Sequence, residues 1–418
     1  MVEAASVQSG IGMLTMKIST LKEHLQELEE DLRMHRAVLS SVRKMPIDIL
    51  GEIFHYVLPY VLDDKGRQQL IDLCLVCKCW RDAAHAMRQL WSGVSIPMDG
   101  GLLSTKKAVL WFQRSGASRK TLEVKSKGSG HYGCDKMGSR CKMECGPLAK
   151  LLADGPALDH HCQNLETLTA DFRGSYFGYW GLEPLVQRQL SGAKIVAIPN
   201  LRELRLQNMG SDAVEIFEHL STPKLVTLDL SFRSKIDDHG PDGYEFGPRL
   251  ENFIKTQSKC EDTFRAFKLR TVWIEGKELI KIFEAYPLLT HLTLDDVSFG
   301  PGEMRSFWWD LWKGFGWYDN PMWLAYLEVL ELLQLPPTEF HFPDLCKFIK
   351  ERPPFRVRFV DGDITKGEMK GNLKRLVVMY QKTKPLGLHR QDNFHVIWRL
   401  RRECGASVEI GPMLYEDK

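Results

Sequence analysis

The chain has 418 residues, a formal net charge of +2 at pH 7, and 44% hydrophobic and 26% charged residues. A chain of this length exceeds the roughly 250–300 residues at which one hydrophobic core stops growing, so we expect more than one structural unit. The near-neutral charge argues against a dedicated nucleic-acid binder, because such proteins use a strong basic excess to neutralise phosphates.

The sequence gives no sign of export or of membrane insertion. Its first residues lack a basic segment followed by a long apolar core, and no run of about 18 consecutive apolar residues occurs. The ten cysteines are scattered through the chain, which favours reduced thiols. We therefore expect a cytoplasmic or nuclear protein with no membrane partner.

Residues 10–40 carry the pattern of a coiled-coil helix. Apolar residues recur there at alternating four- and three-residue steps: Leu14, Ile18, Leu21, Leu25, Leu28, Leu32 and Leu39. His35 interrupts this seam, and charged residues occupy the positions between its members. The pattern is compatible with weak self-association or pairing with a partner, and equally with a helix that folds back onto its own chain.

A second helix is expected directly after Met45, because Pro46 lies where a helix tolerates proline best. Its apolar residues spread around more of the helix than one core face needs. They are Ile47, Ile49, Leu50, Ile53, Phe54, Tyr56, Val57 and Leu58. A segment this short does not bury them all, so the excess apolar surface predicts a partner.

Two further short helices fit the stretch LIDLCLVCKCWRDAAHAMRQLW at residues 70–91. Together with MPIDILGEIFHYVLP at 45–59, this stretch resembles an F-box domain, in particular that of the F-box-like proteins expanded in fungi. The chain departs from the family pattern at Met45, where leucine is typical, at Gly51 inside a helix, and in the insertion YVLDDKGRQQ.

The resemblance assigns three small helices to residues 42–96 and implies docking onto a Skp-type adaptor, which links an F-box protein to a cullin. By similarity, the adaptor-facing residues are Met45, Pro46, Ile49, Leu50 and Ile53. Val76, Cys77 and Trp80 would hold the later helices against the first, as core residues of the domain.

Residues 97–163 form a bridging segment in which a helix, a turn and a strand are expected between Lys106 and Gly128. A glycine-rich insertion follows, with His131, Cys134, Cys141 and Cys145. These cysteines lack the Cys-x2-Cys spacing that places two thiolates on one zinc ion, so a surface insertion is the preferred interpretation and no metal site is assigned.

Residues 164–418 repeat an L-x-x-L-x-L strand signal with helical stretches between the copies. The clearest copies are Leu201, Leu204 and Leu206; Leu225, Leu228 and Leu230; Leu289, Leu292 and Leu294; Leu327, Leu330 and Leu332. Weaker ones begin at Leu165, Leu269 and Leu373. The pattern resembles a leucine-rich repeat and predicts an irregular β-α solenoid.

The repeats depart from the leucine-rich-repeat pattern, because the asparagine expected after the last strand leucine is replaced at Met209, Arg233, Val297 and Leu335. A tryptophan-rich stretch at 306–323 interrupts them. Trp308 and Trp312, four residues apart, fit one buried helix face. Trp317 and Trp323 lie beyond two glycines and are the candidate substrate contacts.

The sequence therefore predicts a mixed helix and strand protein, with an N-terminal coiled-coil helix, an F-box and a repeat region that binds a protein substrate. The resemblance implies a non-catalytic substrate adaptor of an SCF-type (Skp-cullin-F-box) ubiquitin ligase, and no catalytic residue or cofactor is assigned. Two alternatives stay open: a coiled-coil scaffold that binds the adaptor without delivering substrates, and a zinc-dependent protein built on the middle cysteines.

Overall fold

The structure is a computed structural model that divides into two compact units, Met1–Tyr60 with Lys65–Leu90, and Val61–Asp64 with Trp91–Lys418. It describes residues 2–39, 45–97, 101–125, 164–172, 195–209, 211–233, 246–286, 288–299, 324, 326–335, 345, 358–360, 363–365, 373–380, 401–402 and 407–412. In the described residues it has seven α-helices and a central parallel sheet. Within that part of the chain, no helix has the length and apolar character needed to cross a membrane.

The first unit is helical. Its helices are α1 (Val2–Leu39), α2 (Ile47–Val57), α3 (Asp64–Val76) and α4 (Lys78–Ala86). The first backbone hydrogen bond of α2 runs from the Leu50 N–H to the Pro46 carbonyl. Pro46 has no N–H, so it leaves no unpaired donor at the start of the helix. Helix α2 packs against α4, and Leu50, Phe54, Leu70, Ala83 and Ala84 are buried in the core of this unit.

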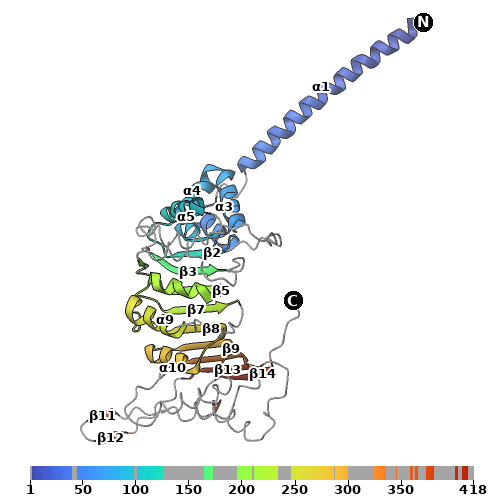
Figure 1. The fold of residues 1–418 in the computed structure, drawn as a ribbon. Helices are drawn as coiled ribbons and strands as arrows, with labels where there is room; N and C mark the ends of the chain where they lie inside the picture. The colour runs from blue at the N-terminus through green and yellow to red at the C-terminus, as the bar shows by residue number, and fades with distance from the viewer. Residues whose placement is uncertain are drawn as a thin grey trace, which may run out of the picture. The chain divides into compact units, whose positions relative to one another are not determined.

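The second unit contains a ten-stranded sheet in which every neighbouring pair of strands is parallel. Its strands are β1 (Gly93–Pro97), β2 (Lys120–Lys125), β3 (Leu165–Asp171), β5 (Glu203–Met209), β7 (Thr227–Phe232), β8 (Ala266–Trp273), β9 (His291–Ser298), β10 (Val329–Leu335), β13 (Arg375–Tyr380) and β14 (Ser407–Pro412). They lie side by side in chain order (Figure 1). The chain therefore returns to the same end of the sheet after each strand.

The strand leucines form two aligned rows across this sheet. The first row is Val94, Leu122, Leu168, Leu204, Leu228, Phe267, Leu292, Leu330, Leu376 and Val408. The second is Ile96, Val124, Ala170, Leu206, Leu230, Leu269, Leu294, Leu332, Val378 and Ile410. Apart from Ile410, all are buried. Because side chains alternate along a strand, the residues between them point to the opposite face.

Helices and aromatic side chains fill the leucine side. Helix α9 (Phe246–Asn252) runs into a π-helix (Phe253–Ser258) and contacts α10 (Gly276–Ala285), and both helices lie beside the strands (Figure 1). The Phe264 ring stacks on Tyr286 with 4.3 Å between ring centroids. Nearer β1, α5 (Gly101–Ser115) contributes Trp111, whose ring lies 4.6 Å from that of Trp91.

Strands β5, β8, β9 and β10 share a backbone irregularity, which lies two residues after the residue that each contributes to the second row. Asn208, Thr271, Asp296 and Gln334 have φ between 52° and 54°, in the left-handed region. The extra residue directs the next side chain back to the buried side, as at Met209, Val272 and Val297. At Met209 and Val297, apolar packing thus occupies a position where the sequence lacks the expected asparagine.

The observed elements can be compared with those predicted. The helix, turn and strand predicted after Lys106 are present as α5 and β2. The stretch at 211–220 forms a 3₁₀ helix, Ser211–His219, and the stretch at 276–286 forms α10. The sheet starts earlier than the repeat region was expected to start, because β1 and β2 already carry both rows. The tryptophan-rich stretch and the Cys/His-rich insertion lie outside the described residues.

Candidate partner-binding surfaces

One side of helix α2 exposes large apolar side chains to solvent. Ile49, Ile53, Tyr56 and Val57 recur at helical spacing, and Tyr56 is 93% exposed. Ile47, at the start of the helix, is exposed as well. Adjacent residues show the division of the helix, since Ile53 is 41% exposed while Phe54 is 2% exposed. Helix α2 therefore has a buried face and a separate apolar face that its own unit leaves uncovered.

Helix α3 exposes a second apolar group. Ile71 and Leu75, four residues apart, are exposed, and so is Val76 at the end of the helix. Ile71 and Leu75 were not among the predicted partner-binding residues, although their four-residue spacing places them on one side of a helix. We call the exposed residues Ile47, Ile49, Ile53, Tyr56, Val57, Ile71, Leu75 and Val76 the α2/α3 apolar residues.

The predicted adaptor-facing residues occupy different environments. Pro46, Ile49 and Ile53 are exposed and Met45 is half-buried. Leu50 differs from the expectation, because it is 1% exposed and belongs to the core. It lies on the same side of α2 as Phe54, one helical turn away, and this side faces α4.

The predicted core residues of the domain also differ in how far they are buried. The Trp80 ring packs against Phe54 with 5.2 Å between centroids and is half-buried, as is Cys77. Val76 differs from its core assignment, since it is 59% exposed as the last residue of α3. Gly51, noted as a departure from the family pattern, is buried, and a Cβ added there would lie 2.9 Å from Met87 Cε. Gly51 therefore permits close packing of α2 against Met87.

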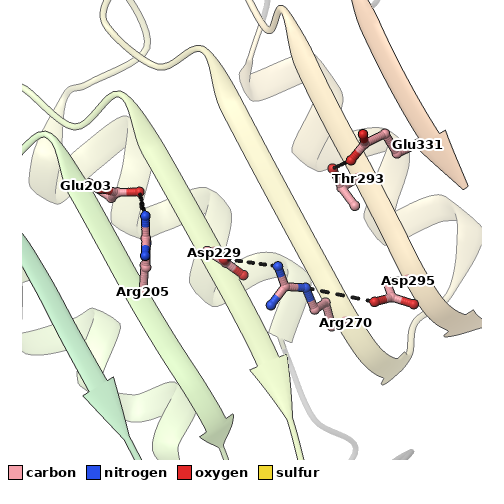
Figure 2. A network of polar contacts seen from close by, with 7 residues as sticks. All are labelled: Glu203, Arg205, Asp229, Arg270, Thr293, Asp295 and Glu331. Carbon is pink, nitrogen blue, oxygen red and sulfur yellow. Dashed lines mark hydrogen bonds and ion pairs between the residues drawn. The ribbon is translucent and has the colours of Figure 1, made fainter. Parts of the chain in front are cut away.

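The second unit offers a polar surface on the face of the sheet opposite the leucine rows. Figure 2 shows the side chains that line it across β5, β7, β8, β9 and β10. Arg205 pairs with Glu203 at 2.7 Å, and the Thr293 hydroxyl donates to Glu331 at 2.9 Å. Between these pairs, Arg270 lies 3.3 Å from Asp229 and 3.9 Å from Asp295. We call these seven residues the sheet polar network.

Asp229 is the most enclosed carboxylate of this network. Its side chain is 9% exposed, and its Oδ1 atom has no hydrogen-bond partner among the residues the structure describes. Burial raises the pKa of the Asp229 carboxyl above its ordinary value, although Arg270, Lys268 and Arg205 oppose this change. Burial likewise raises the pKa of Asp295, opposed first by the hydrogen bond from Gln334.

The outward face changes character toward the last strands. Apart from Ala266, its positions carry charged or polar residues from β2 to β9, whereas β10 and β13 add the half-buried Val329, Leu333 and Met379, and Val377 is buried. One surface therefore combines a network of charges with a small, half-buried apolar end made of Val329, Leu333 and Met379, a mixture suited to a protein partner.

Two groups of residues singled out in the sequence do not belong to these surfaces. Trp317 and Trp323 lie outside the described residues, as do His131, Cys134, Cys141 and Cys145. Among the cysteines that the structure does describe, Cys74, Cys77, Cys79 and Cys260 form no disulfide bond. Within the same part of the chain, no group of three His, Cys, Asp or Glu side chains is arranged to hold a metal ion.

Comparison with known proteins identifies the domain that carries α2, α3 and α4. No match was found among curated proteins. Residues 42–97 match the F-box-like family, over the region that contains these three helices and β1. F-box domains bind Skp-type adaptors and typically function in SCF ubiquitin ligases. The chain thus contains an F-box-like domain at residues 42–97.

Proposed function

We propose that this protein is the substrate-recognition subunit of an SCF-type E3 ubiquitin ligase. The observation that carries the proposal is the exposed apolar side of α2 within a domain that matches the F-box-like family. Large apolar side chains that a unit leaves exposed mark a partner site. The partner would be a Skp-type adaptor, and through it a cullin.

The adaptor would dock on the α2/α3 apolar residues together with Pro46. Ile49 and Ile53 are one helical turn apart, so they would enter the adaptor side by side. Tyr56 would add an amphipathic aromatic side chain, a type enriched at interfaces. Leu50 and Phe54 would contribute indirectly, by fixing α2 against α4.

The second unit would be the substrate receptor. We infer that its parallel strands and intervening helices form a degenerate leucine-rich-repeat-like solenoid of the kind found in fungal F-box proteins, because each strand adds the same two inward residues. Stacked units of this kind offer an extended surface for another protein. The sheet polar network and the apolar end at β10 and β13 would receive the substrate, and Trp317 and Trp323 remain proposed contacts.

The protein itself would be non-catalytic. It would hold a substrate lysine near a charged ubiquitin-conjugating enzyme, and the raised effective concentration would accelerate transfer without an acid, base or nucleophile from this chain. The described cysteines form no disulfide bond, which fits a reducing compartment, so we propose that this activity takes place in the cytoplasm or nucleus.

The test is co-purification of the full chain with a Skp-type adaptor. Pro46→Ala combined with Ile53→Asp should abolish adaptor capture while the circular dichroism spectrum and the melting temperature stay unchanged, because both residues are exposed. Leu110→Asp is the matched control, since it places the same charge at an exposed apolar position of α5. Equal adaptor affinity for both variants would exclude this docking site.

A second candidate function is a scaffold that binds the adaptor but delivers no substrate. The exposed apolar stripe of α1 favours it, because such a stripe organises assemblies rather than substrates. A reconstituted complex with cullin and ubiquitin-conjugating enzyme separates the two functions. Ubiquitin transfer to a protein captured by the second unit supports the receptor, and an assembled complex that transfers none supports the scaffold.

A further inference from the structure

Helix α1 exposes one continuous apolar stripe. Ile11, Leu14, Ile18, Leu21, Leu25, Leu28 and Leu32 follow one another at alternating three- and four-residue steps. Their exposed fractions lie between 49% and 67%, so the chain itself leaves this stripe uncovered. In heptad terms, Ile11, Ile18, Leu25 and Leu32 occupy a positions, and Leu14, Leu21, Leu28 and His35 occupy d positions.

The identity of these residues indicates how many helices the coiled coil contains. Isoleucine at a with leucine at d favours a parallel two-stranded coiled coil, and the first two heptads have this composition. In a parallel pair each d residue meets its own copy, so His35 would form one polar layer near the end of the seam. An antiparallel pair would place a His35 beside Ile11 at both ends.

Several charges beside the stripe are unpaired in the single chain, although His24 lies 3.6 Å from Glu27. On the far side of the helix Arg33 already bonds to Glu30 at 2.6 Å. Glu29, Asp31 and Arg36 flank the stripe and have no ion pair or hydrogen bond within the residues described. A parallel second helix would bring Asp31 beside Arg36 of the second copy, and His24 beside Glu29. These contacts outnumber the one repulsion, between Lys17 and Lys22.

We propose that α1 pairs with α1 of a second copy as a parallel two-stranded coiled coil, in the register set by Ile11, Leu14, Ile18, Leu21, Leu25, Leu28 and Leu32. The pairing produces a dimer with two F-box-like domains and two sheet units. A partner that carries two copies of a recognised segment then binds with an avidity above the single-site affinity. The pairing does not depend on the adaptor, so its failure leaves the proposed ligase function intact.

The first test is the mass of the full-length protein without adaptor, measured by sedimentation at several concentrations. We expect twice the 48.0 kDa chain mass at micromolar concentrations. Leu25→Lys should return the chain mass because it places a charge in the stripe, whereas Met16→Lys, on an exposed position outside it, should leave the dimer intact. His35→Leu should tighten the dimer. A chain mass for the unmodified protein and for His35→Leu would overturn the proposal in favour of a folded-back helix.

The second test determines the direction of the two helices. Asp31→Arg should weaken the dimer about tenfold, since it makes two contacts repulsive. Adding Arg36→Asp exchanges the charges and should restore the affinity only in the parallel arrangement. In an antiparallel pair Asp31 faces Lys17 of the second copy, so the second substitution restores nothing. That result would overturn the parallel register.

Discussion

The Phe54 and Trp80 rings meet with 5.2 Å between centroids and 55° between planes, and they join α2 to α4. The buried Phe54 directly follows the exposed Ile53 and lies two residues before the exposed Tyr56. Neighbouring positions of α2 therefore lie in the core and in solvent. The packed side fixes the helix, and the other side stays available to the adaptor. Stability and binding should therefore respond to different substitutions in the same short helix.

The first prediction concerns the packed side. Phe54→Ala should lower the free energy of unfolding of the first unit by about 3–5 kcal/mol, because it removes a buried ring and leaves a cavity beside Trp80. Ile53→Ala should cost less than about 1 kcal/mol, since its side chain is already partly in water. Denaturant unfolding followed by tryptophan fluorescence measures both changes. Equal losses would contradict the assignment of opposite sides.

The second prediction separates Leu50 from Ile49. Leu50→Ala should destabilise the first unit by about 2–5 kcal/mol as a core truncation. Ile49→Ala should leave stability nearly unchanged and weaken adaptor binding by about tenfold, as expected for an interface side chain that costs more than 1 kcal/mol on truncation. Calorimetric titration of adaptor into folded variants gives the binding loss. Adaptor affinity unaffected by Ile49→Ala would place the docking surface elsewhere.

These differences show what the sequence of α2 could and could not predict. Its apolar residues exceeded one core face, and this excess correctly indicated an uncovered side. Family resemblance placed Leu50 with Ile49 and Ile53, but the helix turns 100° per residue and brings Leu50 round to the side of Phe54. Val76 was assigned to the core from its place in a motif, whereas it ends α3 and its neighbours leave it in solvent.

The sheet was predictable where leucines mark it and less so at its ends. The L-x-x-L-x-L copies locate β5, β7, β9 and β10 because leucine alternation reports one buried face. Strands β1 and β14 carry Val94, Ile96, Val408 and Ile410 instead, and only pairing with β2 and β13 identifies them. The contacts of Arg270 with Asp229 and Asp295 join three strands, so no local pattern contains them.

The third prediction compares two glycines. A Cβ at Gly247 would lie 2.7 Å from Glu278 Cβ, an atom held by the backbone of α10. Gly247→Ala should therefore push α9 from α10 and cost about 1–3 kcal/mol. At Gly51 the closest atom is the mobile end of Met87, so Gly51→Ala should change stability by less than about 1 kcal/mol, with the helix preference for alanine offsetting the contact. Unfolding curves for both variants test the order.

The fourth prediction concerns pH and Asp229. A carboxyl whose folded pKa lies above its unfolded value holds its proton more tightly in the folded state, so stability falls as pH rises between the two values. The cost is complete once the pH lies above the folded pKa. Asp229→Asn should therefore be at least as stable as the unmodified protein at pH 7, and its advantage should shrink as the pH falls toward 4. Glu284→Gln, on the exposed side of α10, is the control for the loss of one carboxylate charge. A constant difference across this pH range would contradict the assignment.

The fifth prediction concerns Tyr286, whose hydroxyl is buried without a hydrogen-bond partner in the described part of the chain. Burial raises the pKa of this hydroxyl well above its ordinary value, so the group stays neutral and its cost is that of an unpaired polar atom. Tyr286→Phe keeps the ring that stacks 4.3 Å from Phe264 and removes only this atom, so it should raise the free energy of unfolding by about 1 kcal/mol. Tyr286→Leu is the matched control, because it also removes the hydroxyl but loses the ring contact and should destabilise. A loss of stability in Tyr286→Phe would mean that the hydroxyl has a partner in the folded protein, and that its position in the aromatic core serves a hydrogen bond rather than packing alone.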